Sequence, residues 1–391
     1  MSHMKKIQDY LMRMTIYRLY IMLLHHMKSL LRPYRIIWLV IWWSLIWGIS
    51  SGAIIRDNSP IAHSWVNTTN NHTPINNTIV DYFRVDQLIN LTGIMISSPK
   101  ESFEWRRFAV ASAKWHLDFW MYDITYNRAK LPLVQLIESK IPVRIILENK
   151  KYSSFGNSYI GTKALLEDAG AKVMSDSDLG LGTNFVHAKT FVTPNWVIIQ
   201  TANLTDGGFN KSREYYVQLT DSWVVANIQA LFDADRKWKP LTISQIHPNI
   251  LVCPINCRSK IQVLIKAATG SIWIQNQYLE DPALLKLISQ KQSSIKDIQM
   301  VLADNDFAQK AVDTFGNKKI SIVSNPYPHA KMMLIDDRYL LISSINYSSN
   351  SMDHNREIGV IITNRDAIEY FKSRFLKDRS KWGTIKTKPK G

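Results

Sequence analysis

The chain has 391 residues, of which 46% are hydrophobic and 20% charged, a composition typical of globular rather than disordered proteins. Its length allows one large domain or two of ordinary size. The formal net charge of +16 favours polyanionic partners such as nucleic acid, anionic lipid headgroups or a phosphate-bearing substrate, without choosing among them.

The amino-terminal part of the chain predicts a membrane anchor. Residues 36–55 are twenty uncharged, mostly apolar positions, enough for a helix to span the hydrocarbon core of a bilayer. The preceding residues 1–35 form a basic segment with seven lysines and arginines against one acid, so the positive-inside rule places this end in the cytoplasm. The rest of the chain would then lie outside the cytoplasm. The alternative is a buried helix of a soluble protein, but such a helix seldom lacks a polar stripe over twenty residues.

A segment rich in Asn, Thr, Ser and Pro, residues 56–85, predicts a flexible linker. Two α/β units are then expected, at 86–238 and 249–382, joined by a linker at 239–248 and followed by a basic tail at 383–391. In the first unit, strands are predicted at 117–124, 143–147, 185–192, 196–201 and 215–219, and helices at 131–140, 163–169 and 222–238. In the second unit, strands are predicted at 271–277, 297–302, 329–335, 339–343 and 357–363, and helices at 258–268, 283–290 and 366–382.

The only two cysteines, Cys253 and Cys257, exclude a disulfide-rich scaffold and a four-cysteine zinc site. Their spacing would allow a small disulfide in an oxidising compartment. Short-range pairs close only where the Cβ atoms converge, so we expect two ordinary thiols near the end of a strand.

One pattern of polar residues occurs twice. The first copy contains His187, Lys189, Asn203 and Glu214. The second copy contains His329, Lys331, Asp336, Asn346 and Glu357. The paired histidines are 142 positions apart, and the paired asparagines and glutamates are 143 positions apart. This register indicates an internal duplication, and therefore two similar units that each carry a mixed sheet covered by helices.

The repeated residues have the chemistry of phosphodiester cleavage. Residues two apart on a strand project to one face, so each copy presents an imidazole beside an ammonium group. Lysine and asparagine together offer a phosphodiester the charge and the directed hydrogen bonds that its oxygens require. Each glutamate can accept from the ring nitrogen that the chemistry does not use. Each copy supplies one histidine, so two facing copies would assemble one nucleophile and one acid, and two lysines would make a metal ion or other cofactor unnecessary.

This pattern resembles the phospholipase D superfamily, whose signature is His-x-Lys-x4-Asp followed by Gly-Ser-x-Asn and a downstream Glu. The likeness covers about residues 86–382. The second copy matches with Ser343-Ser344 in place of Gly-Ser. The first copy has Pro194 where the aspartate belongs and Gln200-Thr201 in place of Gly-Ser.

The resemblance implies two tandem repeats packed about a pseudo-twofold axis. It also implies a metal-independent phosphodiesterase or phosphatidyltransferase that works through a phosphohistidine on the amino-terminal histidine. By that likeness His187 is the nucleophile and His329 the acid, the lysines and asparagines bind phosphate, and Asp336 supports the structure.

The predicted anchor favours a phospholipid substrate, because the linker keeps the catalytic region near its own bilayer. A phospholipase or a cardiolipin synthase-like transferase is the expected activity. The excess of positive charge leaves an endonuclease of the same superfamily as one alternative. A membrane-held member that binds phosphate or lipid without turnover is another, because the first copy of the motif is altered.

Overall fold

The computed structural model describes residues 83–99, 101–149, 156–237, 239, 241–316 and 318–380. The predicted basic segment 1–35, the predicted membrane helix 36–55, most of the linker 56–85 and the tail 383–391 lie outside these residues. Of the helices in the described ranges, none has both the length and the apolar composition needed to cross a bilayer.

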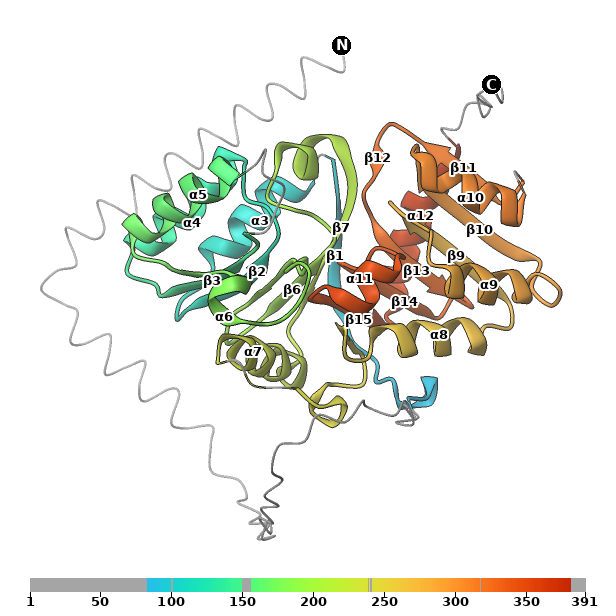
Figure 1. The fold of residues 1–391 in the computed structure, drawn as a ribbon, viewed down its shortest axis with the longest axis horizontal. Helices are drawn as coiled ribbons and strands as arrows, with labels where there is room; N and C mark the ends of the chain where they lie inside the picture. Colours follow the sequence, from blue (N-terminus) through green and yellow to red (C-terminus); the bar gives the residue numbers. More distant parts are fainter. Residues whose placement is uncertain are drawn as a thin grey trace, which may run out of the picture. The chain divides into compact units, whose positions relative to one another are not determined.

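The first sheet is mixed, and it draws almost entirely on the first half of the chain (Figure 1). Its order is β1-β7-β6-β5-β2-β3-β4, and β12 from the second half pairs in parallel with β7. Neighbours are antiparallel from β1 to β2 and parallel from β2 to β4. The strands are β1 (Gly93–Ser98), β2 (Leu117–Met121), β3 (Val143–Leu147), β4 (Lys172–Met174), β5 (Thr190–Val192), β6 (Val197–Gln200), β7 (Ser212–Leu219) and β12 (Tyr327–Pro328).

The second sheet repeats this plan. Read from β8, its order is β8-β15-β14-β13-β9-β10-β11, which matches the first sheet strand for strand. Its β9, β10 and β11 are again parallel, and the other neighbours are antiparallel. The strands are β8 (Ile250–Cys253), β9 (Ser271–Asn276), β10 (Asp297–Ala303), β11 (Ile320–Val323), β13 (Lys331–Ile335), β14 (Tyr339–Ser343) and β15 (Glu357–Ile362).

Helices cover the outer faces of both sheets (Figure 1). Buried side chains of α3, α4 and α5 pack on the first sheet, and those of α8, α9 and α10 pack on the second. The helices are α3 (Ser102–Ala111), α4 (Asn127–Glu138), α5 (Gly156–Ala169), α6 (Asp176–Leu179), α7 (Ser222–Arg236), α8 (Cys257–Ala267), α9 (Pro282–Lys291), α10 (Asp306–Phe315), α11 (Ser349–His354) and α12 (Arg365–Ser380). The predicted class, an α/β fold with two mixed sheets flanked by helices, is therefore confirmed.

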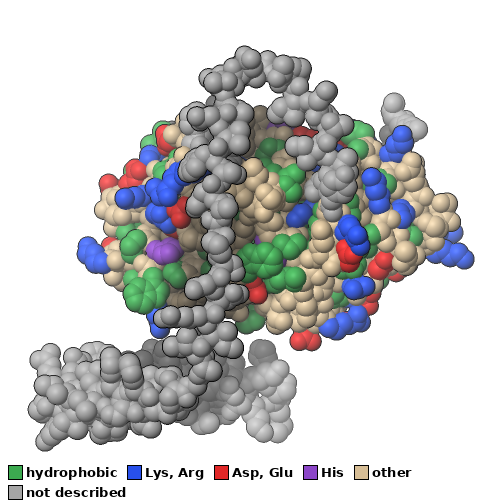
Figure 2. Space-filling model, turned by 90° about the horizontal axis from the view of Figure 1, so that it is seen from below, with side chains coloured by type: hydrophobic (Ala, Val, Ile, Leu, Met, Phe, Trp, Pro, Cys, Tyr) green, Lys and Arg blue, Asp and Glu red, His purple; other side chains and the backbone are tan. Residues whose placement is uncertain are grey.

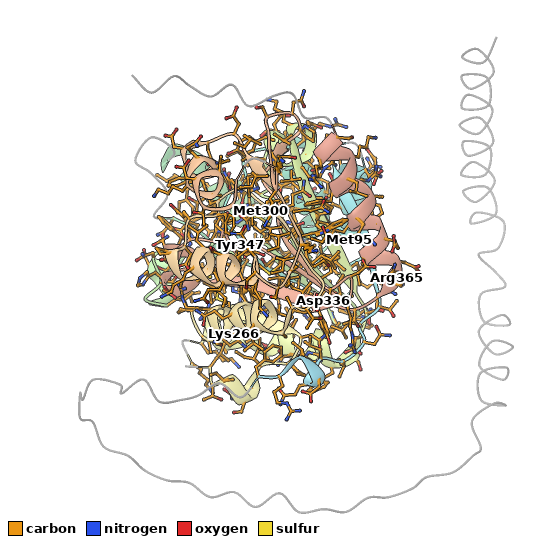
Figure 3. The ribbon with its side chains drawn as sticks, turned by 90° about the vertical axis from the view of Figure 1, so that its right-hand side faces the viewer. Met95, Lys266, Met300, Asp336, Tyr347 and Arg365 are labelled. Carbon is orange, nitrogen blue, oxygen red and sulfur yellow. A yellow bond between two sulfur atoms is a disulfide. The ribbon has the colours of Figure 1, made fainter. Side chains whose placement is uncertain are left out.

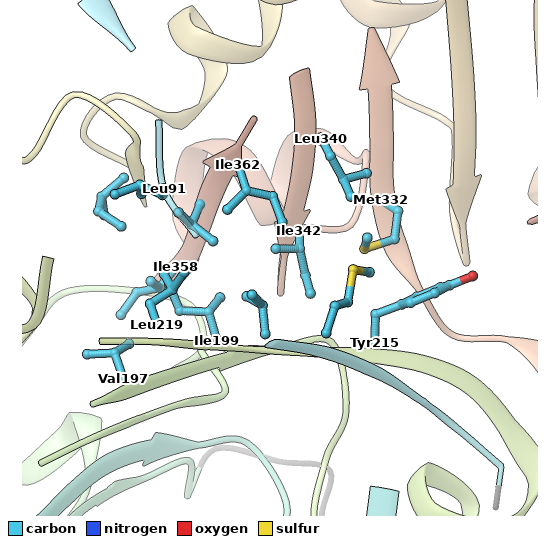
Figure 4. Close-up of a cluster of buried hydrophobic side chains, with 14 of the residues drawn as sticks. Leu91, Val197, Ile199, Tyr215, Leu219, Met332, Leu340, Ile342, Ile358 and Ile362 are labelled. Atoms are coloured by element: carbon cyan, nitrogen blue, oxygen red, sulfur yellow. The ribbon is translucent and has the colours of Figure 1, made fainter. Parts of the chain in front are cut away.

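The inner faces of the two sheets share one hydrophobic core, to which α7 and α12 also contribute. Figure 4 shows Ile342 and Met332 of the second sheet pointing toward strands of the first, which carry Ile199 and Tyr215. All four side chains are fully buried. Because burial of apolar area is the main favourable term in folding, this core holds the two repeats face to face.

The strands that were predicted to carry the motif histidines are shorter than expected. β5 begins at Thr190 and β13 at Lys331, so His187 and His329 both lie on extended segments before the strands. The reason is that these segments bond to the opposite repeat. The amides of His187 and Ala188 donate to the Arg356 carbonyl at 2.9 and 2.8 Å, and β12, just before His329, pairs with β7.

The expectation of two free thiols is wrong, because Cys253 and Cys257 form a disulfide. Cys253 ends β8 and Cys257 begins α8, and the tight turn between them brings the two Cα atoms to 5.1 Å. That separation lies within the range that a disulfide can bridge. Both residues are fully buried beneath the second sheet's outer layer.

At the end of the second motif strand, the Asp336 carboxylate bonds to backbone amides. Its carboxylate accepts hydrogen bonds from the backbone amides of Thr269, Gly270 and Ser271 at 2.7–3.1 Å, and from the Thr269 hydroxyl. Its φ of 53° lies in the left-handed region, which aspartate tolerates. The residue, labelled in Figure 3, therefore ties the turn after β13 to the loop between α8 and β9.

The first repeat makes the corresponding turn without a carboxylate. The hydroxyl of Thr193 accepts from the amides of Asn195 and Trp196 at 3.3 and 3.2 Å. The Thr193 amide donates to the Trp196 carbonyl at 2.9 Å. The Thr193 hydroxyl thus stabilises the turn between β5 and β6 that contains Pro194. In the second repeat the Asp336 carboxylate lies at the corresponding turn.

We predict that Asp336→Asn lowers the free energy of unfolding by about 1–3 kcal/mol, because asparagine accepts fewer of these hydrogen bonds while still tolerating the backbone conformation. Burial alone would raise the pKa of Asp336, but the backbone hydrogen bonds hold it below its usual value. The stabilisation is therefore present above the ordinary carboxyl pKa and is lost as the pH falls through the lower pKa of the folded state. Urea denaturation at neutral and acidic pH measures both effects. Asp313→Asn, on the exposed side of α10, is the control, and an equal loss in that variant would contradict the prediction.

Candidate active site

The predicted histidines each reach a glutamate of the opposite repeat. Nδ1 of His187 lies 2.9 Å from both carboxylate oxygens of Glu357, and Nδ1 of His329 lies 2.7 Å from Oε1 of Glu214. His187 is 8% exposed, Glu214 1% and Glu357 0%. A carboxylate at Nδ1 fixes the tautomer of a neutral imidazole, so that Nδ1 carries the proton and Nε2 the lone pair.

The two predicted lysines lie buried beside these pairs. In both copies the lysine Nζ donates at 2.6 Å to the carbonyl of its own histidine, from Lys189 to His187 and from Lys331 to His329. Burial lowers the pKa of Lys331 to about 8, although Glu214 and Glu357 both act to raise it. The Lys331 ammonium group therefore interacts with the glutamates of both half-sites. The two half-sites are adjacent to each other.

The electrostatics of this place favour the neutral form of the two histidines. Burial lowers the pKa of His187 to about 4, against the opposing effect of Glu357, and the charges of Lys189 and Lys331 lower it further. Burial likewise lowers the pKa of His329, with the same two lysines acting in that direction. A neutral imidazole with a free Nε2 is the form that can attack phosphorus.

Each repeat carries one of the two predicted asparagines, directly after the second strand of the motif hairpin. Asn203 follows β6 and Asn346 follows β14, and both are partly buried. The amide oxygen of each is buried and accepts no hydrogen bond among the described residues. A half-turn of either amide would present its NH2 group instead, so each side chain can serve as donor or acceptor to a ligand.

The two glutamates differ in their support. Glu357 accepts from the Ser351 hydroxyl and from Nδ2 of Asn355 at 3.2 Å. Burial alone would raise the pKa of Glu357, but His187 and Lys189 hold it below its usual value. Glu214 accepts from the Thr201 hydroxyl.

The sequence did not assign these supporting residues. Thr201 had a signal, because it occupies the position of Ser344 in the repeat, 143 residues earlier. Tyr122 was also missed: its ring lies edge-to-face on His187 with a centroid separation of 4.8 Å, and Lys189 Nζ lies 5.2 Å from the ring centroid. The equivalent strand-end position in the second repeat is Gln277, whose Oε1 lies 3.4 Å from Lys331 Nζ. Their place at the ends of β2 and β9 could have indicated them.

The described residues contain no group of three histidine, cysteine or acidic side chains arranged to hold a metal ion. Two further acids of the second repeat, Asp304 and Asp306, belong to no such group. Asp304 accepts from the Ser324 hydroxyl at 2.9 Å, and Asp306 opens α10.

A family model described as the cardiolipin synthase, phospholipase D-like domain matches this chain twice, over residues 109–236 and 261–379. The chain belongs to the phospholipase D superfamily. The two matched regions contain both histidine–lysine motifs, both asparagines and both glutamates. The resemblance that the motif suggested is thereby confirmed.

Cardiolipin synthases of Listeria monocytogenes are among the relatives of this phospholipase D-like chain. Those of strains HCC23 and CLIP80459 are each 25% identical over 125 residues, which cover 29% of this chain and 26% of the relative. The matched segment thus spans about a quarter of the length of these curated relatives.

Two solved structures share the fold of this family member. Phosphatidylserine synthase of Haemophilus influenzae Rd KW20 aligns with a TM-score of 0.55 and 13% identity, covering 74% of this chain and 88% of that one. Polyphosphate kinase of Porphyromonas gingivalis has the same TM-score and identity, and covers 73% of this chain and 50% of that one. At this identity the likeness shows the fold alone.

We predict that the ring of His187 stays neutral from pH 7 down to about pH 4, because burial disfavours its charged form. The unfolded chain binds this proton near pH 6.5, so the contribution of His187 to stability is present above pH 6.5 and is lost as the pH falls toward 4. Nitrogen-15 NMR of histidine-labelled protein measures the titration, with His187→Gln to assign the signal and exposed His354 as the internal reference. A midpoint near 6.5 for His187 would contradict the buried site.

Proposed function

We propose that this chain is a membrane-anchored phospholipase D-like phosphodiesterase that acts on phospholipid headgroups by hydrolysis or phosphatidyl transfer. One observation carries the proposal. Two imidazoles, each bonded through Nδ1 to a carboxylate of the opposite repeat, lie around a shared pair of buried lysines. Such an arrangement offers one nucleophile and one acid to a single phosphorus atom.

In the first step, Nε2 of His187 attacks phosphorus and the bond from phosphorus to the leaving alcohol oxygen breaks. His329 acts in its protonated form, which Glu214 at Nδ1 favours, and gives the proton on Nε2 to that oxygen, so the alcohol leaves neutral. Neutral His187 suits the attacking role, and Glu357 stabilises the positive charge that forms on its ring. The product is a phosphohistidine on His187.

In the second step, water or a second alcohol attacks the phosphohistidine, and Nε2 of His329 takes its proton. The bond from phosphorus to His187 then breaks and the imidazole is restored. Water as the acceptor gives hydrolysis, and a lipid alcohol gives phosphatidyl transfer. The same group acts as acid and then as base, as microscopic reversibility requires.

In this scheme the lysines and asparagines stabilise the negative charge on the phosphate oxygens. Lys189 and Lys331 are fully buried, where an ammonium group interacts with an anion more strongly than it would in water. The amides of Asn203 and Asn346 add directed hydrogen bonds. These four groups would stabilise the transition state without a metal ion.

A lipid substrate is favoured by the sequence before the catalytic region and by the family. The predicted membrane helix 36–55 and linker 56–85 would hold the site near its own bilayer. Because residues 1–35 carry a net +6, ten of the sixteen net positive charges lie after them, which would also suit a nucleic acid. On the visible part of the face in Figure 2, however, lysines and arginines are interspersed with acids rather than gathered in one stripe. Nucleic acid is therefore an outcome of the test below.

An outward-facing catalytic region is part of the proposal. The disulfide between Cys253 and Cys257 supports it, because disulfides persist mainly in oxidising compartments. We expect that blocking free thiols while the cells are lysed in denaturant, followed by reduction, exposes two new thiols per chain, counted by the mobility shift with a polyethylene glycol maleimide. The Cys257→Ser variant should expose none. Two thiols already blocked before reduction would place the region in a reducing compartment.

We predict that His187→Ala and His329→Ala each lower phosphodiesterase activity by about 10³-fold or more, because each removes one of two indispensable groups. His329→Ala should also accumulate the phosphoryl ester of the substrate on His187 when the leaving group is p-nitrophenolate, which needs no acid. Phosphohistidine detection by mass spectrometry checks this, with the double variant as control. Retained activity in both single variants would refute the two-histidine scheme.

The substrate test uses the full-length protein in detergent–lipid micelles. Labelled phosphatidylcholine, phosphatidylglycerol and plasmid DNA are offered separately, with His187→Ala as the matched control and EDTA in a parallel series. Release of choline or formation of cardiolipin supports the lipid proposal, and insensitivity to EDTA supports the role given to the lysines. Nicking of DNA alone, or no turnover of any substrate, would overturn it.

A further inference from the structure

Two buried ion pairs cross between the repeats behind the candidate active site. Nε and Nη2 of Arg213 contact the two carboxylate oxygens of Asp378 at 2.5 and 2.8 Å. Nη2 of Arg356 lies 3.0 Å from Oδ1 of Asp235. Each arginine is at most 8% exposed and each aspartate at most 2%. The two pairs are related by the repeat, since both the arginines and the aspartates are 143 positions apart.

We propose that these two pairs are positioning residues for the two histidine–glutamate pairs, setting how closely each imidazole meets its carboxylate. The inference rests on the function proposed above. It assigns the pair of Arg213 and Asp378 to the acid His329, and the pair of Arg356 and Asp235 to the nucleophile His187.

The first argument is the place of the arginines. Arg213 directly precedes Glu214, and Arg356 directly precedes Glu357. Neighbouring residues of an extended chain project to opposite faces, so each arginine can hold the strand from behind while the glutamate faces a histidine. The aspartates lie in the last turns of α7 and α12.

The second argument is that the backbone of each arginine also holds the segment that carries the opposite histidine. The Arg356 carbonyl accepts from the amides of His187 and Ala188. Arg213 pairs with Pro328 in the short β7–β12 ladder, next to His329. Movement of either arginine would thus displace a glutamate and its histidine relative to one another.

The third argument is that each aspartate is fixed by a second donor in the same position of both repeats. Trp120 Nε1 donates to Asp235 at 2.9 Å, and Gln275 Nε2 donates to Asp378 at 3.0 Å. Trp120 pairs with Thr190, and Gln275 pairs with Met332. Thr190 and Met332 each lie three residues after the motif histidine of their repeat. The guanidinium of Arg213 contacts both oxygens of Asp378, a fork that sets direction as well as distance, whereas the contact between Arg356 and Asp235 runs through Nη2.

Burying two charges has a desolvation cost that their attraction only partly offsets. A buried ion pair is therefore weak evidence that the pair serves to stabilise the fold. A role in orientation makes a distinct prediction for each pair. Asp378→Asn should loosen Glu214 and His329, and so impair proton donation. Asp235→Asn should loosen Glu357 and His187, and so impair attack.

The test compares two diesters, one that releases an alcohol and one that releases p-nitrophenolate. For Asp378→Asn we expect the single-turnover rate of leaving-group release to fall about tenfold or more on the alcohol diester, with less than about threefold change on the p-nitrophenyl diester, because only the first needs the acid in this step. For Asp235→Asn we expect both rates to fall alike. Asp337→Asn, which breaks a partly exposed ion pair with Arg365, is the matched control and should leave both rates unchanged. Equal loss on both diesters in every variant would overturn the assignment.

A second readout does not need turnover. In nitrogen-15 NMR spectra, Asp378→Asn should shift the ring signals of His329 while sparing His187, and Asp235→Asn should do the reverse. If either aspartate variant does not fold, Arg213→Lys and Arg356→Lys keep the charge, lose the directed guanidinium contacts, and should give the same pattern. Unchanged histidine signals in folded variants would overturn the proposal. A wild-type protein that cleaves neither diester would instead refute the proposed function, and the NMR result would still decide the positioning role.

Discussion

The structure depends on one constraint: each motif imidazole meets a carboxylate that the opposite repeat supplies. Glu214 and Glu357 are fully buried, and a buried carboxylate is costly unless it is paired and hydrogen-bonded. The histidines and lysines around each carboxylate meet that requirement only when the two sheets face each other. The hydrophobic core between the sheets and the polar site at its edge therefore specify the same arrangement.

Two similar half-sites can take different roles because their surroundings differ. Glu357 is held by Ser351 and Asn355, whereas Glu214 is held by Thr201. Tyr122 packs on His187, while the second repeat has the polar Gln277 in the equivalent place. These differences lie outside the repeated motif. Duplication gave two equal sets of motif residues, and the flanking residues distinguish them.

Much of the fold and the set of site residues followed from register alone. Corresponding residues recur at a separation of 142 or 143 positions, which identified two equivalent sets before any geometry was known. Periodicity gave β3 and β14 at their observed bounds, because apolar runs between turn residues are a strong strand signal. The crossing of the glutamates could not be predicted, since periodicity shows which face a residue takes but not which sheet it will meet. The same limit explains why the strands predicted at 185–192 and 329–335 are longer than the observed β5 and β13.

Other features were missed for local reasons. No helix was predicted at α10, because its acids mask the apolar face that Ala311 and Phe315 supply, and Asn305 caps it. The disulfide was missed because the closeness of Cys253 and Cys257 depends on the turn between β8 and α8. Short strands such as β4 and β11 carry too few residues for a period to be read.

The separation of the crossed pairs along the chain has a consequence for biosynthesis. The carboxylate that His187 contacts, Glu357, lies 170 residues further along the chain, and the imidazole that Glu214 contacts, His329, lies 115 residues further along. A ribosome that has finished the first repeat has therefore made neither half-site. Contacts between such distant residues form late in folding, because chain closure must precede them. The proposed enzyme would thus stay inert until nearly all of its chain had left the ribosome, and would become competent in a single final event.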